Sequence, residues 1–196
     1  MISRIMPAEI WQAKTILQKP EYKKGEILIA EPDILHRIDE MAGGLAERYQ
    51  GQKLLMIGLL NGAFMFASDL CKALWRAGLE DGELDFISVG SYGKNQKSTG
   101  ELTVYKQLKI PIKDRHVLLV EDLTDTRLTL AKIHQLMIDG GAASVQSCVL
   151  VLKRVKNLEI QYEPDFVGFS IPDLWIEGGG MDSNERGRMN PNIIVK

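Results

Sequence analysis

The sequence contains few of the residues that would identify its function directly. Of its 196 residues only two are cysteine and three are histidine, and the formal net charge is −2. Both cysteines lie in apolar periodic segments, which favours buried, reduced thiols in a cytoplasmic protein over a disulfide or a reactive thiol. The three histidines have no metal-ligand spacing. A nearly neutral chain has no overall field that attracts nucleic acid or an anionic membrane, so its composition disfavours both as partners.

Long hydrophobic runs and the common nucleotide motifs are also absent. The longest apolar stretch, residues 54–67, is interrupted by Asn61-Gly62 and is too short to span a bilayer. The N-terminus has no sustained apolar segment of the kind found in signal peptides. Nothing matches G-x-x-x-x-G-K-[ST], and no G-x-G-x-x-G follows a predicted strand. We therefore expect a soluble, cytoplasmic protein without these two phosphate-binding motifs.

What is present is an alternation of strand and helix patterns. Residues 33–51 place apolar side chains on one helical face, with Asp33 as the expected N-cap and Gly51 as the stop. Two more helices are predicted after residues 62 and 127, and the polar stretch after residue 92 predicts a loop. Apolar runs typical of buried strands cover residues 54–60, 84–92, 116–120, 144–152 and 165–171. This alternation predicts an α/β fold with a mostly parallel sheet covered on both faces.

Ligands bind to such sheets beyond the carboxyl ends of the strands. That rule selects the turns after Leu60, Ser91, Val120, Leu152 and Ile171. These five turns are therefore the candidate positions for a functional site.

The turn after Val120 carries the most chemistry, in the stretch VEDLTDTRLTL. Glu121 and Asp122 end the predicted strand, Asp125 lies one turn later, and threonines bracket the helix start. Free backbone N–H groups and hydroxyls at a helix start bind phosphate, whereas the carboxylates must face ribose hydroxyls or a bound Mg²⁺. The stretch fits a ligand with a phosphate at one end and a diol or a metal at the other. A solvated acidic turn followed by an ordinary N-cap is the simpler alternative.

At this point the sequence resembles a known family. VLLVEDLTDTRLTL is similar to the phosphoribosyl-diphosphate signature of the purine phosphoribosyltransferases, and IGLLNGAFMFASDLCKAL resembles the first loop and helix of the hypoxanthine-guanine phosphoribosyltransferases. DFISVGSYG resembles the strand before their flexible Ser-Tyr loop, and VLKR resembles the strand that carries the base-recognising lysine. PDFVGFSIPDLWIEGGGMDSNERGR is similar to their C-terminal stretch. The five motifs occur in the family's order within residues 33–196.

The resemblance implies the type I phosphoribosyltransferase fold, a mostly parallel sheet flanked by helices with a small hood from the termini. Residues 1–32 are then an N-terminal extension packed on or near the hood, and residues 33–196 form the phosphoribosyltransferase domain. The implied reaction joins phosphoribosyl diphosphate and a 6-oxopurine, hypoxanthine or guanine, to give IMP or GMP and pyrophosphate in purine salvage. Mg²⁺ is the implied cofactor, and a homodimer or homotetramer is the implied assembly. The alternative is a weakly active or inactive relative that binds a nucleotide in a regulatory or assembly role.

The resemblance also implies residue roles. Asp125 would act as general base for the purine N7 proton, Lys153 would donate to O6, and Arg188 would bind pyrophosphate. Trp175 would stack on the purine, and the backbone of Ile176 would recognise its edge. Without the resemblance, Lys153 reads as a strand-end side chain that reaches solvent, and Trp175 as a core aromatic.

The implied metal residues are Glu121 and Asp122, which hold the ribose hydroxyls and through them the Mg²⁺ complex, and Asp182, which touches the metal. The implied substrate-binding residues are Asn61, Gly62, Ser91, Tyr92, Glu121, Asp122, Asp125, Thr126, Arg127, Leu128, Thr129, Lys153, Trp175, Ile176, Asp182 and Arg188.

The chain departs from the family pattern at several of these positions. Arg127 replaces the glycine of the phosphate loop, where a positive φ would cost it about 1–2 kcal/mol. With a negative φ its guanidinium would instead point at the phosphate. Leu128 stands where a polar or basic residue is common, and Asn61 replaces a basic residue, although Asn-Gly is also simply a good turn. Glu177 replaces an apolar residue and is expected to face a purine amino group, alter base choice or point to solvent. Residues 178–180 are all glycine, which predicts a looser last loop.

Overall fold

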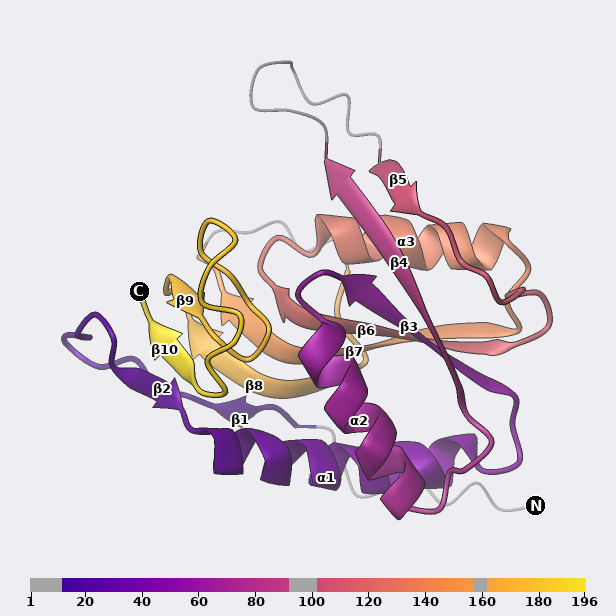
Figure 1. Cartoon of the computed structure of the whole chain (residues 1–196), viewed down its shortest axis with the longest axis horizontal. Coiled ribbons are helices and arrows are strands. Elements are labelled where there is room, and N and C mark those ends of the chain that lie inside the picture. The colour runs from indigo at the N-terminus through magenta and orange to yellow at the C-terminus, as the bar shows by residue number, and fades with distance from the viewer. Residues whose placement is uncertain (1–11, 92–101, 157–161) are drawn as a thin grey trace.

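The structure, a computed structural model, describes residues 12–91, 102–156 and 162–196. In the described part of the chain the main sheet has seven strands in the order β1-β8-β7-β6-β3-β4-β5, and a smaller sheet has the order β2-β10-β9 (Figure 1). All neighbours in the main sheet are parallel except β4 and β5. The predicted α/β fold with a mostly parallel sheet is confirmed. We call the smaller, antiparallel sheet the hood sheet.

The elements have the following bounds. The main-sheet strands are β1 (Lys14–Thr15), β3 (Leu54–Leu60), β4 (Glu83–Ser91), β5 (Leu102–Lys106), β6 (His116–Thr124), β7 (Ser144–Arg154) and β8 (Phe166–Pro172). The hood strands are β2 (Ile27–Ile29), β9 (Ile176–Glu177) and β10 (Ile193–Val195). The helices are α1 (Glu31–Tyr49), α2 (Phe64–Arg76) and α3 (Leu128–Asp139).

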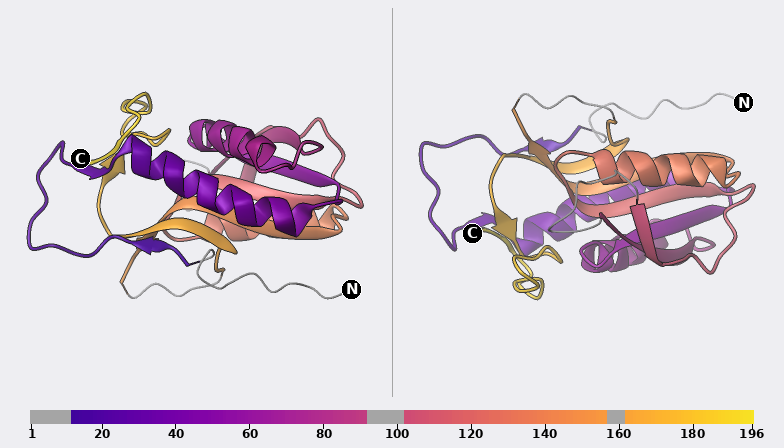
Figure 2. Two further views of the ribbon diagram at one scale, coloured as in Figure 1. Left: turned by 90° about the horizontal axis from the view of Figure 1, so that it is seen from below. Right: turned by 90° about the horizontal axis from the view of Figure 1, so that it is seen from above.

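Helices cover both faces of the main sheet, as its continuous apolar strands require. Helices α1 and α2 lie on one face and α3 lies on the other (Figures 1 and 2). Along β6, Leu118 and Val120 pack into the core under α1 and α2, whereas Val117 and Leu119 pack into the core under α3. Successive side chains of a strand point to opposite faces, so a fully apolar strand fills two cores at once. No helix among the described residues is long and apolar enough to cross a membrane.

Three element boundaries differ from the sequence predictions. Helix α1 begins at Glu31 with Ala30 as its N-cap, because proline is well suited to the first helical turn. The predicted N-cap, Asp33, lies in that first turn instead, where its charge favours the helix dipole. Strand β6 continues to Thr124, so the acidic pair lies within the strand rather than at its end. The last two residues of the predicted polar loop, Leu102 and Thr103, belong to β5, which pairs antiparallel with β4.

The N-terminal extension contributes to both sheets. Strand β1 adds a parallel edge strand beside β8, and β2 pairs with β10 in the hood sheet. The buried Arg37 of α1 holds the start of this segment, since its Nη2 donates to the carbonyl oxygen of Gln12 at 2.8 Å. The same guanidinium donates from Nε to the carbonyl of Gly168 in β8 at 3.0 Å. The extension is therefore tied to the domain by backbone pairing and by one buried side chain.

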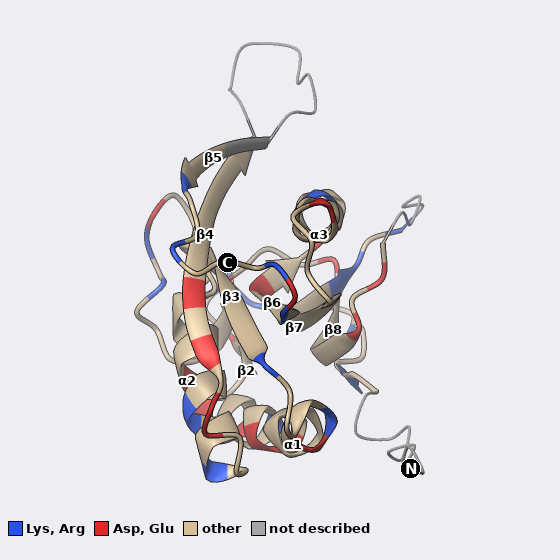
Figure 3. Cartoon of the chain, turned by 90° about the vertical axis from the view of Figure 1, so that its right-hand side faces the viewer, with Lys and Arg blue, Asp and Glu red and all other residues tan. Residues whose placement is uncertain are grey.

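The surface carries both signs of charge. Figure 3 shows basic and acidic residues interspersed along α1 and α2. Several form ion pairs, such as Arg76 with Asp39 at 2.6 Å and Lys72 with Asp69 at 2.7 Å. This distribution agrees with the near-neutral composition and gives α1 and α2 no continuous basic face.

Cys148 is buried as predicted, and Cys71, which is also free, is only partly buried.

Asp85 is a buried carboxylate that fixes the chain after β5. It accepts hydrogen bonds from the backbone N–H groups of Phe86 at 2.7 Å, Lys109 at 2.5 Å and Ile110 at 3.0 Å, and from Lys106 Nζ at 3.2 Å. Burial alone would raise the pKa of Asp85, but these donors, Ile110 first, lower it to about 2. The ionised form is therefore strongly favoured in the folded protein.

We expect Asp85→Asn to lower the free energy of unfolding by about 2–4 kcal/mol at pH 7, because an amide cannot accept from all four donors. Urea denaturation measures this, with the exposed Asp81→Asn as the control. The wild-type contribution is present above pH 4 and is lost as the pH falls towards 2, because the pKa of this carboxyl is lower in the folded state. Equal urea midpoints for the two variants at pH 7 would contradict this assignment.

Candidate active site

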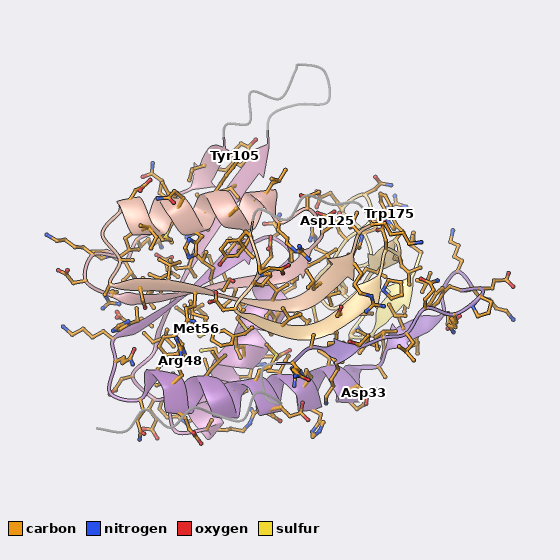
Figure 4. All side chains as sticks on the ribbon, turned by 180° about the vertical axis from the view of Figure 1, so that it is seen from behind. Asp33, Arg48, Met56, Tyr105, Asp125 and Trp175 are labelled. Carbon is orange, nitrogen blue, oxygen red and sulfur yellow. The ribbon has the colours of Figure 1, made fainter. Side chains whose placement is uncertain are left out.

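The candidate site lies where the direction of strand connection reverses. The chain moves from β3 to β4 on one side and then returns to β6 on the other side of β3. In open α/β sheets ligands bind at such a switch point, beyond the carboxyl ends of the strands. Figure 4 shows Asp125 and Trp175 at this end of the molecule, away from Met56 near the start of β3.

Three segments far apart in sequence touch here through glycines. A Cβ atom added to Gly62, in the turn after β3, would lie 2.1 Å from Oδ2 of Asp122 in β6. A Cβ atom added to Gly180, in the C-terminal loop, would lie 2.3 Å from the carbonyl oxygen of Gly62. Both positions therefore exclude any side chain. The peptide bond between Leu60 and Asn61 is cis. The structure thus brings the first predicted loop, the acidic strand and the C-terminal loop together.

Glu121 and Asp122 form a pair of carboxylates with an excess of negative charge. Burial, reinforced by the charges of Asp122 and Asp125, raises the pKa of Glu121 to about 8. Its Oε2 is buried without a hydrogen-bond partner. Burial also raises the pKa of Asp122 to about 6, although backbone N–H groups and the nearby Arg188 lower it and Asp182 raises it. The site is therefore suited to a ligand that brings hydroxyl donors or positive charge to the pair.

The predicted phosphate loop connects β6 to α3. Asp125, Thr126, Leu128 and Thr129 are all exposed, and the N–H of Thr126 donates to Oδ1 of Asp125. Helix α3 begins at Leu128 and has no side-chain cap hydrogen bond at its start. The first N–H groups of a helix have no partners within it, so this end of α3 presents free donors to solvent.

Arg127 adopts the left-handed conformation that the family's glycine would adopt easily. Its φ is 61° and its ψ is 3°. The sequence left a positive and a negative φ open for Arg127, and the positive one is therefore correct. This conformation costs an arginine about 1–2 kcal/mol. The side chain is nevertheless buried, and its Nη1 lies 3.3 Å from Oε1 of Glu163 in the β7–β8 connection. Sequence reasoning missed Glu163, because no motif links it to a loop 36 residues away.

Of the remaining predicted site residues at strand ends, only Lys153 is described together with its side chain. Lys153 is partly buried in β7, and its ammonium group makes no hydrogen bond or ion pair within residues 12–91, 102–156 and 162–196. Ser91 ends β4, and its side chain lies outside the described part of the structure. Tyr92 lies outside the described residues altogether. The assignments of these three residues stay predictions.

The predicted base-side residues lie at the hood sheet. The side chain of Trp175 is 65% exposed, so the interpretation of this residue as a core aromatic is wrong. Its Nε1 donates to Oγ of Ser183 at 3.3 Å, which orients the ring. Ile176 is buried in β9 and pairs with Val195. Glu177 is only 8% exposed, which contradicts the solvent-facing alternative, and its Oε2 lies 2.8 Å from Nζ of Lys196.

Asp182 and Arg188 form an ion pair, with Nη2 and Oδ1 2.8 Å apart. Arg188 also donates from Nη1 to the carbonyl of Gly180 at 3.0 Å, so it braces the loop that touches Gly62. The glycine run 178–180 is not held loosely, contrary to our expectation. Its three N–H groups donate to the carbonyls of Met181, Asn190 and Arg188, at 3.0, 2.7 and 3.2 Å.

The described residues contain no group of three or more His, Cys, Asp or Glu side chains arranged to hold a metal ion by themselves. A cation bound by the acidic pair would therefore need oxygen atoms from the ligand as well. A cavity of about 410 Å³ lies elsewhere, between the end of α2 and the start of β3, and is lined by residues such as Met56, Leu74 and Trp75. It shares no residue with the candidate site.

Comparison with known proteins finds relatives over most of the chain. The model of the phosphoribosyl transferase domain matches residues 25–184, a range that contains every predicted site residue except Arg188. The hypoxanthine-guanine phosphoribosyltransferase of Aquifex aeolicus is 36% identical over 174 residues, which are 88% of this chain and 95% of that protein. The hypoxanthine phosphoribosyltransferase of Escherichia coli K12 is 35% identical over 170 residues, 86% of this chain and 93% of that protein.

Solved structures give the same result. A hypoxanthine phosphoribosyltransferase from Staphylococcus aureus matches with a TM-score of 0.79 and 33% identity, over 88% of this chain and 91% of that one. One from Trypanosoma cruzi matches with a TM-score of 0.81 and 32% identity, over 90% of this chain and 94% of that one.

The raised pKa of Glu121 predicts how stability depends on pH. The folded protein keeps this proton between pH 4.5 and about 8, where the unfolded chain releases it, so the contribution is complete below pH 4.5 and is lost as the pH rises towards 8. Without ligand, we expect the melting temperature to fall over this range less steeply in Glu121→Gln than in the wild type. The exposed Glu47→Gln is the control, and equal slopes for all three proteins would contradict the expectation.

Proposed function

The chain belongs to the phosphoribosyltransferase family, and we propose that it transfers the 5-phosphoribosyl group of phosphoribosyl diphosphate to hypoxanthine or guanine, a reaction of purine salvage. The observation that carries this proposal is the contact of Asp122 with the turn after β3, beside the free N-terminus of α3. It brings ribose-binding carboxylates and a phosphate-binding helix start to one switch point. Relatives that are 35–36% identical over most of the chain carry hypoxanthine or hypoxanthine-guanine phosphoribosyltransferase names.

The reaction needs groups that stabilise a cation-like C1 of the ribose while pyrophosphate leaves. In the proposed mechanism Glu121 and Asp122 accept hydrogen bonds from the ribose hydroxyls, and donors of residues 125–129 bind the 5′-phosphate. Arg188 binds the departing pyrophosphate. Asp125 takes the N7 proton as the base attacks C1, and its exposure leaves it accessible to the purine.

The base is selected by hydrogen bonds and stacking. Lys153, whose ammonium group has no partner in the described residues, donates to the purine O6. Adenine presents a donor at that position, so the contact favours 6-oxopurines. Trp175 supplies the stacking face, and the backbone of Ile176, fixed in β9, recognises the base edge.

Mg²⁺ fits this set of residues. Glu121 has a buried oxygen without a hydrogen-bond partner, and besides burial the charges of neighbouring carboxylates help to raise the pKa values of the acidic pair. Glu121 and Asp122 would hold the ion through the ribose hydroxyls, and Asp182 would touch it. Substrate oxygens would complete its ligands, and the ion would offset the charge of the leaving pyrophosphate. We also propose a homodimer or homotetramer in the cytoplasm.

Two observations favour the alternative, a nucleotide-binding protein with little catalysis. Arg127 stands in the phosphate loop with a strained backbone, and Asn61 brings no charge to the pyrophosphate side. The acidic pair and Asp125 argue for catalysis, because ligand binding alone has no need of a general base.

A base screen tests the proposed function. With Mg²⁺ and phosphoribosyl diphosphate we expect conversion of hypoxanthine or guanine to the monophosphate and none of adenine, followed spectrophotometrically with xanthine included. Absence of turnover with all four bases, in a preparation that still binds a nucleoside monophosphate, would support the alternative.

Asp125→Asn tests the general base. Because the amide cannot take up a proton, we expect kcat to fall about 10²- to 10⁴-fold, while KM for phosphoribosyl diphosphate changes by no more than about threefold. Steady-state kinetics measure both constants, and the remote, exposed Asp81→Asn is the control. A rise in KM with kcat unchanged would show that Asp125 binds substrate without acting as the base.

A further inference from the structure

Arg127 is held in an unfavourable backbone conformation. It is the N-cap residue of α3, at φ 61° and ψ 3°, a region that favours glycine. Glycine would relieve the strain and leave the helix start unchanged. An arginine there therefore implies that its side chain contributes something that offsets this cost.

The contacts of the side chain do not provide this compensation. The residue is 8% exposed, and its Nε and Nη1 are buried without a hydrogen-bond partner. In the described part of the chain its only charged partner is Glu163, whose oxygen is 3.3 Å from Nη1 without the geometry of a hydrogen bond. The Glu163 side chain is 58% exposed, so water weakens the pair. These buried guanidinium N–H groups lack acceptors, which an anion would supply.

The start of α3, which Arg127 caps, offers further donors for an anion. Arg127 directly precedes the first turn of α3, whose N–H groups have no partner within the helix. Thr126 and Thr129 are exposed on either side and carry hydroxyl groups. A guanidinium is a planar fork of donors that matches a phosphate. The side chain and the helix start together form a site for a monoester phosphate.

We propose that Arg127 binds the 5′-phosphate through its guanidinium and that Glu163 occupies this guanidinium until the phosphate displaces it, which presupposes the phosphoribosyl chemistry of the proposed function. The guanidinium of Arg127 then contributes binding free energy, which compensates for the strain of the Arg127 backbone. Glu163 sets the affinity of the loop for phosphorylated ligands.

Glu163 is positioned by its neighbour. The hydroxyl of Tyr162 donates to Oγ of Ser147 in β7 at 2.9 Å, and its ring lies 5.1 Å from that of His134 in α3. The Glu163 backbone is thus fixed beside α3, while its exposed carboxylate is free to turn to solvent. Carboxylate and phosphate compete for the same donors, and their negative charges repel each other. Loss of the carboxylate should therefore assist phosphate binding.

The two partners of this ion pair should have opposite effects on ligand affinity. We expect Arg127→Gly to weaken binding of ribose 5-phosphate about tenfold or more, the loss of a charge-assisted hydrogen bond. We expect Glu163→Gln to strengthen it about two- to fivefold, the loss of a partly exposed competing ion pair. The double variant should bind like Arg127→Gly, because Glu163 acts through Arg127. Isothermal titration calorimetry measures all three, with the exposed Glu47→Gln as the control and circular dichroism to verify folding.

If both single variants weaken binding equally, Arg127 only anchors the loop to Glu163, and the proposal is overturned. A gain in affinity with Arg127→Gly also overturns it, because the arginine would then obstruct the site. Magnesium pyrophosphate is the second ligand, and its affinity should stay within about twofold in both variants. Ribose 5-phosphate binding requires no base and no turnover. A wild type that fails the base screen but shows these opposite shifts would refute the proposed reaction and leave the phosphate assignment intact.

Discussion

The rest of the site depends on the contact between the Asp122 carboxylate and the backbone of Gly62. It joins the end of β3 to β6 across the switch point, at a distance that leaves no room for a side chain. Gly180 packs on Gly62 in turn, so the C-terminal loop rests on the same point. The sheet register aligns β3 with β6 through five residue pairs, ending with Gly58 opposite Val120, and so fixes where the two strands present these groups. A larger residue at either glycine would therefore separate all three segments.

Side chains of both charges lie close to this contact. Carboxylates gather in β6, where burial and the charges of neighbouring carboxylates raise their pKa values, and the cationic Arg188 lies close enough to lower the pKa of Asp122. A ligand with a hydroxylated centre and anionic ends would satisfy both sets of charges, which neither a simple anion nor a simple cation would do. This complementarity of charge supports a phosphorylated sugar as the ligand of the acidic strand more strongly than any single residue does.

The sequence predicted the layers and the convergence of the first loop, the acidic strand and the C-terminal loop, because both rest on local patterns. Apolar runs and helical periodicity located all three helices and the central strands, and the family motifs selected turns that do converge. The pattern could not show that Arg127 would adopt a positive φ or pair with Glu163, because both depend on packing across the β7–β8 connection. The outward position of Trp175 and the burial of Glu177 were also decided by tertiary contacts. Short strands such as β1 and β2 escaped detection because two or three residues carry no periodicity.

The two halves of the site rest on different sheets, and this division has a consequence for the base. The proposed phosphate- and ribose-binding groups belong to the main sheet, whereas Trp175 and Ile176 stand at the hood sheet, which is assembled from both ends of the described chain. The N–H of Lys196 donates to the carbonyl of Trp175 at 2.8 Å, and the side chain of Lys196 pairs with Glu177. The orientation of the purine-stacking face is thus set by the C-terminal strand rather than by the core. Changes in that strand should act on base recognition while the proposed sugar-phosphate groups keep their positions, because those groups follow strands of the main sheet.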